Sequence, residues 1–524
     1  MVDSAPGECL SAAMRPRRAL LALTATLALV LPACDTGEGV PEAGGGAAGG
    51  GEGGTLVAAI SSEPDQLDPH NTTAYASFQV LENVFDTLVQ PTPELEFEPA
   101  LAESWETSDD QLTWTFELRD DVTWHNGRAF SAEDVVYSFT RIIDEELSNA
   151  YRFTSVVEVR AVDDDTVEFL LDQPTPNLLA NVGSYKGVAV VARENVEDGS
   201  IGSQPVGTGP FRFESLTPGQ GAVLSRNDEY WGGDVALGGV EYRFIPESVA
   251  ALTSLRSGEV HWTDNVPPQQ VQTLLDDDTL VAESVPSNDY WYIAPNHTRP
   301  PFDDERVRRA LALGIDREAV TRAAQFDAAT PNQTAIPQGR PFSVDYAPYE
   351  RDVAEARRLL EEAGAVGTTV DLMVTSEFPE TVTAAEVVAG QLAEVGLTVQ
   401  PRVLGFGQWL AEQGEGSFDM FLLGWLANID PDDYYYAQHH STGANNFQGY
   451  SNPEVDAALD AGRQATEDAE REQFYDTAVR RIVDDVSYLY LYNPDVVQAW
   501  RPEVSGYTVH PNRAIRWRDV SLDG

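Results

Sequence analysis

Residues 113–141 read TWTFELRDDVTWHNGRAFSAEDVVYSFTR, and two patterns inside this stretch indicate the class of fold. Trp114, Phe116 and Leu118 alternate with polar residues, which is the period of a strand that buries one face. Ser131-Ala-Glu-Asp134 has the spacing of a capping box, and it predicts a helix that begins there and runs through residue 141. Strand and helix in close succession are typical of α/β and α+β proteins.

Strand and helix patterns continue to alternate on both sides of this stretch. Helix starts are predicted at Asp352, at Asn452 with Pro453 at the first helical position, and at Thr466. Strand patterns occupy residues 54–60, 370–375, 418–425 and 488–492. Because no short repeat accompanies this alternation, we expect an α/β, or mixed α+β, protein with several lobes.

Composition and charge exclude several classes of protein. The chain has 524 residues, of which 42% are hydrophobic, so it can bury large cores and is not disordered in bulk. Its net charge of −52 repels nucleic acid, and we expect no nucleic-acid partner. Cys9 and Cys34 are the only cysteines, which excludes a disulfide scaffold and a CxxC zinc module. Lys186 is the only lysine.

The sequence also lacks the common motifs of enzymes. It contains no HExxH, no GxSxG and no phosphate-binding loop with a lysine, so we expect no catalytic residue, no cofactor and no enzyme activity. Residues 430–433, with His439 and His440 nearby, could form a metal site. The stronger interpretation is a helix start with Asp430 as N-cap and Pro431 after it, so no metal is expected.

The amino-terminal segment indicates where the protein acts. Arg15, Arg17 and Arg18 precede the apolar run 19–31, whose 13 residues are too few to span a membrane and fit an export signal. The run ends at Leu31-Pro32-Ala33-Cys34, which resembles a bacterial lipobox whose cysteine receives a lipid. A plain signal peptide with an incidental cysteine is the alternative. Residues 1–13 carry no signal character, so Met14 is the expected start.

A glycine-rich segment, 34–53, follows the lipidation site. Such a composition forms a flexible tether rather than a core. We therefore expect a signal peptide over 1–33, a tether over 34–53 and a folded body over 54–520. The body would be extracytoplasmic, in the periplasm or anchored by Cys34 to the outer face of the cell membrane.

Several motifs in the body identify a family. The stretches that carry the resemblance are 99–105, 118–127, 130–139, 205–211, 226–231, 301–310, 424–425, 430–432 and 450–453. In this order they resemble the family 5 extracellular solute-binding proteins, which are the dipeptide and oligopeptide receptors of ABC importers. The resemblance covers nearly all of residues 54–520.

This resemblance implies a fold, a function and partners. The fold is a periplasmic-binding-protein-like clamshell with an extra lobe, and the chain crosses twice between its halves. Lobe I would comprise about 54–88, 201–288 and 495–520, lobe II about 89–200 and lobe III about 289–494. A monomer would capture an oligopeptide or a similar small polar solute by domain closure. It would then deliver the solute to an ABC permease and ATPase complex.

The resemblance also implies a set of ligand-binding residues. In the family an aspartate after the Gly-Trp pair holds the amino group of the ligand, whereas this chain has Ala427 or Asn428 there. An amide cannot offer the charge-assisted bond that a carboxylate gives an ammonium group, although Asp430 could supply the charge from another angle. The predicted ligand-binding residues are Thr73, Tyr75, Tyr290, Tyr292, Trp425, Ala427, Asn428, Asp430, Asn445 and Phe447.

The substituted aspartate leaves other functions open. The same receptor could bind an opine, a glutathione-like thiol, a sugar or a metal chelate. A tethered sensor and a tethered hydrolase are more distant alternatives.

Overall fold

The computed structural model describes residues 53–426 and 429–523, and every structural statement below concerns these residues. The predicted signal peptide, Cys34 and the tether up to residue 52 lie outside the described residues, as do Ala427 and Asn428. No helix within the described ranges is long and apolar enough to span a membrane.

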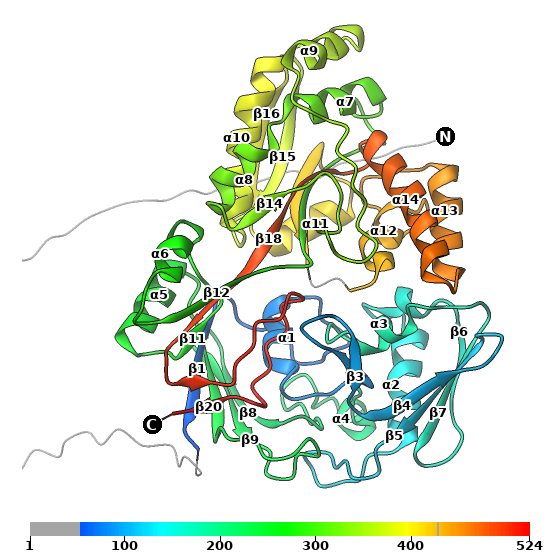
Figure 1. Cartoon of the computed structure of the whole chain (residues 1–524), viewed down its shortest axis with the longest axis vertical. Coiled ribbons are helices and arrows are strands. Elements are labelled where there is room, and N and C mark those ends of the chain that lie inside the picture. The colour runs from blue at the N-terminus through cyan, green and yellow to red at the C-terminus, as the bar shows by residue number, and fades with distance from the viewer. Residues whose placement is uncertain (1–52, 427–428, 524) are drawn as a thin grey trace, which may run out of the picture. The chain divides into compact units, whose positions relative to one another are not determined.

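A single large sheet connects the two halves of the molecule (Figure 1). Its strand order is β16-β15-β17-β13-β18-β11-β1-β10-β9-β8, and β12 and β14 also pair with β18. Its strands are β1 Thr55–Ile60, β8 Phe211–Thr217, β9 Gly221–Arg226, β10 Gly239–Phe244, β11 Trp262–Thr263, β12 Val281–Pro286, β13 Tyr290–Pro295, β14 Ala329–Pro331, β15 Thr369–Thr375, β16 Thr398–Leu404, β17 Met420–Trp425 and β18 Leu489–Trp500.

Strand β18 belongs to both halves of this sheet. Near its start Tyr492 pairs with Trp291 of β13, and at its end Trp500 pairs with Trp262 of β11. The chain crosses a second time where β12 leads into β13, and β12 runs antiparallel to β18. Two adjacent crossings of this kind form the hinge of the clamshell, so the predicted fold class is confirmed.

Most buried hydrophobic residues belong to three regions, which we call cores I, II and III, and a small cluster of Phe78, Tyr185 and Ala514 is separate from them. Core I comes from residues 56–85, 189–285 and 496–522, and core III comes from residues 290–492. Core II comes from residues 88–192 and contains the antiparallel sheet β4-β5-β7-β6. The lobe boundaries expected from the resemblance remain predictions.

The remaining elements lie around these sheets (Figure 1). The helices are α1 Tyr75–Leu81, α2 Ala132–Asp144, α3 Leu178–Gly183, α4 Arg193–Glu197, α5 Ser248–Ser257, α6 Val271–Leu275, α7 Glu305–Gly314, α8 Arg317–Gln325, α9 Val353–Glu362, α10 Pro379–Val395, α11 Phe406–Gly414, α12 Pro431–His439, α13 Pro453–Gln464 and α14 Asp468–Asp484. The other strands are β2 Val89–Pro91, β3 Phe97–Pro99, β4 Ala102–Thr107, β5 Thr113–Leu118, β6 Val156–Ala161, β7 Thr166–Leu171, β19 Val504–Ser505 and β20 Ser521–Leu522, and two 3₁₀ turns span Ala150–Phe153 and Pro268–Gln270.

The local predictions for residues 113–141 are confirmed. Trp114, Phe116 and Leu118 are the buried residues of β5, and they pack in core II. Ser131 is the N-cap of α2, and its backbone N–H donates to the Asp134 carboxylate at 3.1 Å. The helix ends at Asp144, three residues beyond the predicted end.

Other boundaries differ from the sequence expectation. Asp352 and Asn452 are the N-caps of α9 and α13 as predicted, but Glu467 rather than Thr466 is the N-cap of α14. The strand predicted for 488–492 begins at Leu489 and continues to Trp500, because β14 pairs with Tyr492, Asn493 and Pro494 and β12 pairs with the residues from Asp495 to Trp500.

Candidate ligand-binding cleft

Trp425 and Tyr290 lie opposite each other at the end of two neighbouring strands. Trp425 closes β17 and pairs with Tyr290, the first residue of β13. Gly424 is required at this point, since an added Cβ would lie 2.7 Å from the ring of Trp291. Trp425 is half-buried and packs against core III, so one part of its indole faces away from the core.

The two tyrosines predicted as ligand contacts are buried in this structure. Tyr290 is 1% exposed, and its ring stacks on Tyr434 of α12. Tyr292 is 2% exposed, and its ring stacks on Tyr488 with centroids 3.9 Å apart. Both rings therefore lie inside core III, and their contact with a ligand stays a prediction.

Thr73 and Tyr75 lie at the start of α1. Thr73 is exposed, and the Tyr75 hydroxyl donates to the backbone carbonyl of Arg513 at 3.1 Å. This bond connects α1 to the C-terminal segment of core I.

Asp430, Asn445 and Phe447 have structural contacts of their own. Asp430 is the N-cap of α12 with Pro431 behind it, and this confirms the predicted helix start. Its carboxylate accepts two hydrogen bonds from Arg471, at 2.9 and 3.0 Å, so its charge is already paired. Asn445 and Phe447 are half-buried, and Phe447 packs against core III.

Two ion pairs join the cores near these residues. Arg513 of the C-terminal segment pairs with Asp289, whose side chain is fully buried just before β13. Arg513 has φ 64°, a left-handed conformation that is costly for a residue with a side chain and that recurs at functional sites. Core II contributes Arg152, which pairs with Asp433 of α12.

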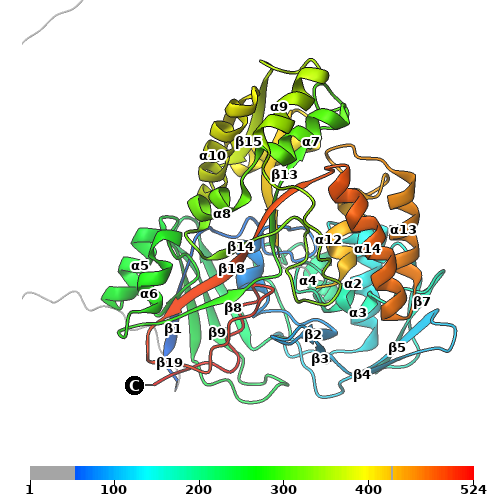
Figure 2. The same ribbon diagram turned by 45° about the horizontal axis from the view of Figure 1, so that its top comes forward.

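Further hydrogen bonds connect core II to core III. The Asn177 amide donates to Asp432 at 3.2 Å, where α3 lies close to α12 in both views (Figure 1, Figure 2). The Gln464 amide donates to Gln173 at 2.9 Å. The structure therefore represents a closed arrangement, in which polar contacts span the cleft between core III and the other two cores.

Lys186 lies where the three cores meet. It is within electrostatic reach of both ion pairs, Arg152 with Asp433 and Arg513 with Asp289. Burial, and then the charge of Arg152, lower the pKa of Lys186 to about 8, although the two carboxylates oppose this shift. Within the described part of the chain its ammonium group makes no hydrogen bond or ion pair. A half-buried ammonium group without a protein partner is suited to receive an anionic group of a ligand.

Glu380 is a carboxylate that, like the Lys186 ammonium group, has no ion-pair partner among the described residues. It lies in the first turn of α10, near Arg513 and Tyr492. Burial raises the pKa of Glu380, and a hydrogen bond from its own backbone and the charge of Arg513 only partly offset this. Its carboxylate accepts a hydrogen bond from its own backbone N–H, and among the residues that the structure describes it forms no ion pair. Lys186 and Glu380 are thus a cation and an anion without an ion-pair partner among the described residues, and both lie within electrostatic reach of Arg513.

Sequence reasoning did not assign these charged residues. The residues of the two ion pairs are 224 and 281 positions apart in the chain, so no local spacing could reveal them. The uniqueness of Lys186 was visible, but composition does not indicate where a residue lies.

This closed clamshell, with unpaired charges between its halves, defines a solute-binding protein. Residues 96–447 match the family described as "Bacterial extracellular solute-binding proteins, family 5 Middle", and the chain belongs to this family. It is therefore an extracytoplasmic binding protein, and the prediction that it is not an enzyme is confirmed.

The similarity to individual relatives extends over most of this chain and most of each relative. The glutathione-binding protein GsiB of Pectobacterium atrosepticum is 29% identical over 89% of this chain and 94% of its own length. Two solved structures each superpose with a TM-score of 0.82 over 90% of this chain. DppA from Helicobacter pylori in complex with the peptide STSA is 27% identical, and the superposition covers 98% of its chain. The dipeptide-binding protein of Pseudoalteromonas sp. SM9913 in complex with Met-Leu is 25% identical, and the superposition covers 100% of its chain.

Proposed function

We propose that this protein is the receptor of an ABC importer and captures a short peptide or a peptide-like solute such as glutathione. The observation that carries this proposal is the unpaired Lys186 ammonium at the meeting point of the three cores. The names of the relatives support it, since they are described as binding glutathione, the peptide STSA or Met-Leu. Delivery to a permease and ATPase complex follows from the proposed role.

The ligand chemistry follows from the charges in the cleft. Lys186 would bind a carboxylate of the ligand, because a buried ammonium gains most from a charged partner. Glu380 would bind its amino group, in place of the family aspartate whose position Ala427 or Asn428 holds in this chain. Trp425 would provide an apolar wall, and Thr73 and Tyr75 would border the opening.

A thermal-shift panel tests the proposed function. A ligand that binds only the folded protein raises its apparent stability. We expect glutathione, Met-Leu or STSA to raise the melting temperature, and versions with an acetylated amine or an amidated carboxylate to raise it less. An opine, a sugar or a metal chelate that stabilises the protein while peptides do not would contradict the peptide-like class.

Trp425→Ala serves as the site control for this panel. We expect this substitution to lower the affinity for the stabilising ligand by about 10-fold or more, because it removes a large aromatic contact. The matched control is Trp105→Ala, because Trp105 packs against core II away from the cleft. Equal affinity of wild type and Trp425→Ala would show that the ligand binds elsewhere.

The lipid anchor is a separate part of the proposal. We expect Cys34→Ala, expressed in a bacterial host, to lose lipid labelling and to appear in the soluble extracytoplasmic fraction, because the thioether to the lipid cannot form. Fractionation and metabolic labelling with a fatty acid measure this. Unchanged membrane retention of the variant would contradict lipidation at Cys34. We further propose that the receptor acts as a monomer.

A further inference from the structure

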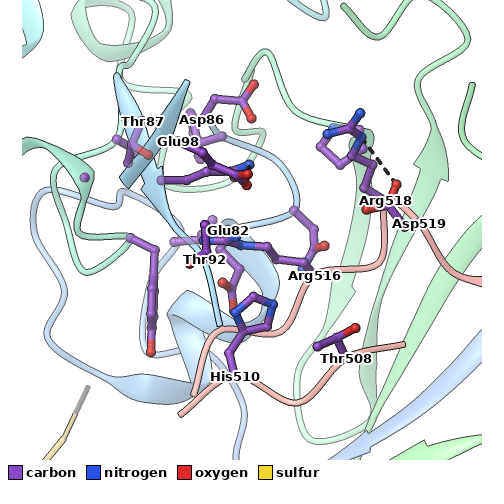
Figure 3. A pocket seen from close by; sticks show the side chains of 18 of the residues that line it. Glu82, Asp86, Thr87, Thr92, Glu98, Thr508, His510, Arg516, Arg518 and Asp519 are labelled. Atoms are coloured by element: carbon purple, nitrogen blue, oxygen red, sulfur yellow. Dashed lines mark hydrogen bonds and ion pairs between the residues drawn. The ribbon is translucent and has the colours of Figure 1, made fainter. Parts of the chain in front are cut away.

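A cavity lies at the junction of core I and core II. It has a volume of about 400 Å³, within the range of small-molecule sites. Its walls come from the end of α1 and the residues after it, from the β2–β3 hairpin and from residues 506–519 of the C-terminal segment (Figure 3). None of the predicted ligand-binding residues that the structure describes lines this cavity.

The junction that forms the cavity is well packed elsewhere. Residues 188–192 alternate between the two cores: Val188 and Val190 pack in core II, whereas Ala189 and Val191 pack in core I. The two cores are therefore fixed against each other, and the cavity between them is a preformed feature rather than a gap that closes with core III.

Arg516 supplies a free cation to this cavity. Figure 3 shows its side chain extending from the C-terminal segment toward Glu82. In the parts of the chain that are described, its guanidinium group makes no hydrogen bond or ion pair, although burial lowers its pKa. A guanidinium presents five donors in a planar fork, whose best partner is a carboxylate.

Glu82 supplies a free acceptor a short distance away. One carboxylate oxygen accepts the backbone N–H of Ile515 at 2.7 Å, whereas Oε2 is buried without a partner. Burial raises the pKa of Glu82 well above its usual range, and a bound cation would lower it again. His510 is 6% exposed, and its Nδ1 also has no partner.

Most of the other charged groups of the cavity are already engaged, and Glu98 accepts a hydrogen bond from Gln90 at 2.8 Å. Asp86 accepts hydrogen bonds from Thr208 at 2.7 Å and from Trp231 at 3.0 Å. Arg518 donates to the carbonyl oxygen of Gly232 and pairs with Asp519 at 3.6 Å. Inside the cavity the groups without a hydrogen bond or ion pair include the Arg516 guanidinium, Glu82 Oε2 and His510 Nδ1, whereas Glu94 lies exposed at its edge. The surrounding acids disfavour a multiply charged anion such as phosphate.

We propose that this cavity is a second ligand site, which binds a zwitterionic molecule of the size of a free α-amino acid. Arg516 binds its carboxylate, Glu82 binds its ammonium group, and His510 Nδ1 accepts a further hydrogen from the ammonium group. The site is independent of the cleft around Lys186, so either site can exist without the other.

Titration with free L-amino acids tests this site. Wild-type protein without signal peptide is titrated with each amino acid up to about 10 mM, followed by NMR saturation transfer and calorimetry. We expect at least one amino acid to bind, and its N-acetyl and amide derivatives to bind about 10-fold or more weakly. Binding of inorganic phosphate in its place, or of no amino acid, would overturn the proposal.

Three variants separate this site from the cleft. Arg516→Gln and Glu82→Gln should each weaken amino-acid binding by about 10-fold or more, and either variant suffices if the other does not fold. Arg518→Gln is the matched control and should bind as the wild type does, since its guanidinium is already engaged. Lys186→Met should also leave this binding unchanged. Equal binding by wild type, Arg516→Gln and Glu82→Gln would overturn the assignment.

Discussion

Replacing Lys186 with methionine is expected to weaken binding of a carboxylate-bearing ligand by about 10- to 100-fold. A hydrogen bond to a charged group contributes about 1.5–3 kcal/mol, and each 1.4 kcal/mol is a factor of ten in affinity. Methionine keeps the length and the apolar stem of the side chain, so the change removes mainly the charge. Calorimetric titration with the ligand identified by the panel measures the effect.

The same residue predicts how affinity depends on pH. Because the pKa of Lys186 is about 8 in the free protein, its ammonium group is present below that pH and lost above it. An anionic ligand stabilises the ammonium form, so affinity should be constant well below pH 8 and fall as the pH rises through it. The α-amino group of a peptide ligand also titrates near pH 8, so the comparison uses an N-acetylated ligand, for which Lys186→Met should remove this decline and Lys186→Arg should shift it beyond the measured range. A wild-type affinity that stays constant to pH 10 would contradict this assignment.

Replacing Asp289 with asparagine is expected to lower the free energy of unfolding by about 3–5 kcal/mol. Asp289 is fully buried and pairs with Arg513, whose side chain is only 19% exposed. Removing one member of a buried pair leaves an uncompensated charge in the interior, and this is the source of the large cost. Urea unfolding followed by tryptophan fluorescence measures the change.

An exposed ion pair provides the control for this variant. Arg357 and Glu361 of α9 form an i,i+4 pair on the surface, with both side chains more than half exposed. Glu361→Gln should therefore leave the unfolding curve nearly unchanged, because water already solvates both charges. If Asp289→Asn and Glu361→Gln had equally small effects, the pair at Asp289 would not hold the C-terminal segment in place.

Features encoded by neighbouring residues could be predicted from the sequence. The strand at Trp114 and the helix caps at Ser131, Asp352 and Asn452 each depend on a few adjacent residues, and the structure contains all of them. The long strand β18 was underestimated, since its continuation beyond Tyr492 depends on β12, which lies some 200 positions earlier in the chain.

The site was predictable only in part, for the same physical reason. Trp425 was singled out by its resemblance to a family motif, and the structure places it beside Tyr290 at a strand end. Lys186 and Glu380 are candidates because each is removed from water and lacks an ion-pair partner. Both properties depend on the tertiary structure, so the neighbouring sequence could not predict them. The position of Arg513 depends on its left-handed backbone conformation, which an arginine in the sequence does not predict.

The most direct test of the central claim is the rate at which Lys186 reacts with an amine-specific acylating reagent at pH 8. Lys186 is the only lysine, so peptide mapping separates its modification from that of the N-terminal amine. If the cleft holds a peptide-like ligand on this ammonium, saturating glutathione, Met-Leu or STSA will slow acylation of Lys186 and leave the N-terminal amine unaffected. Acylation at the same rate with and without every one of these ligands would contradict the claim.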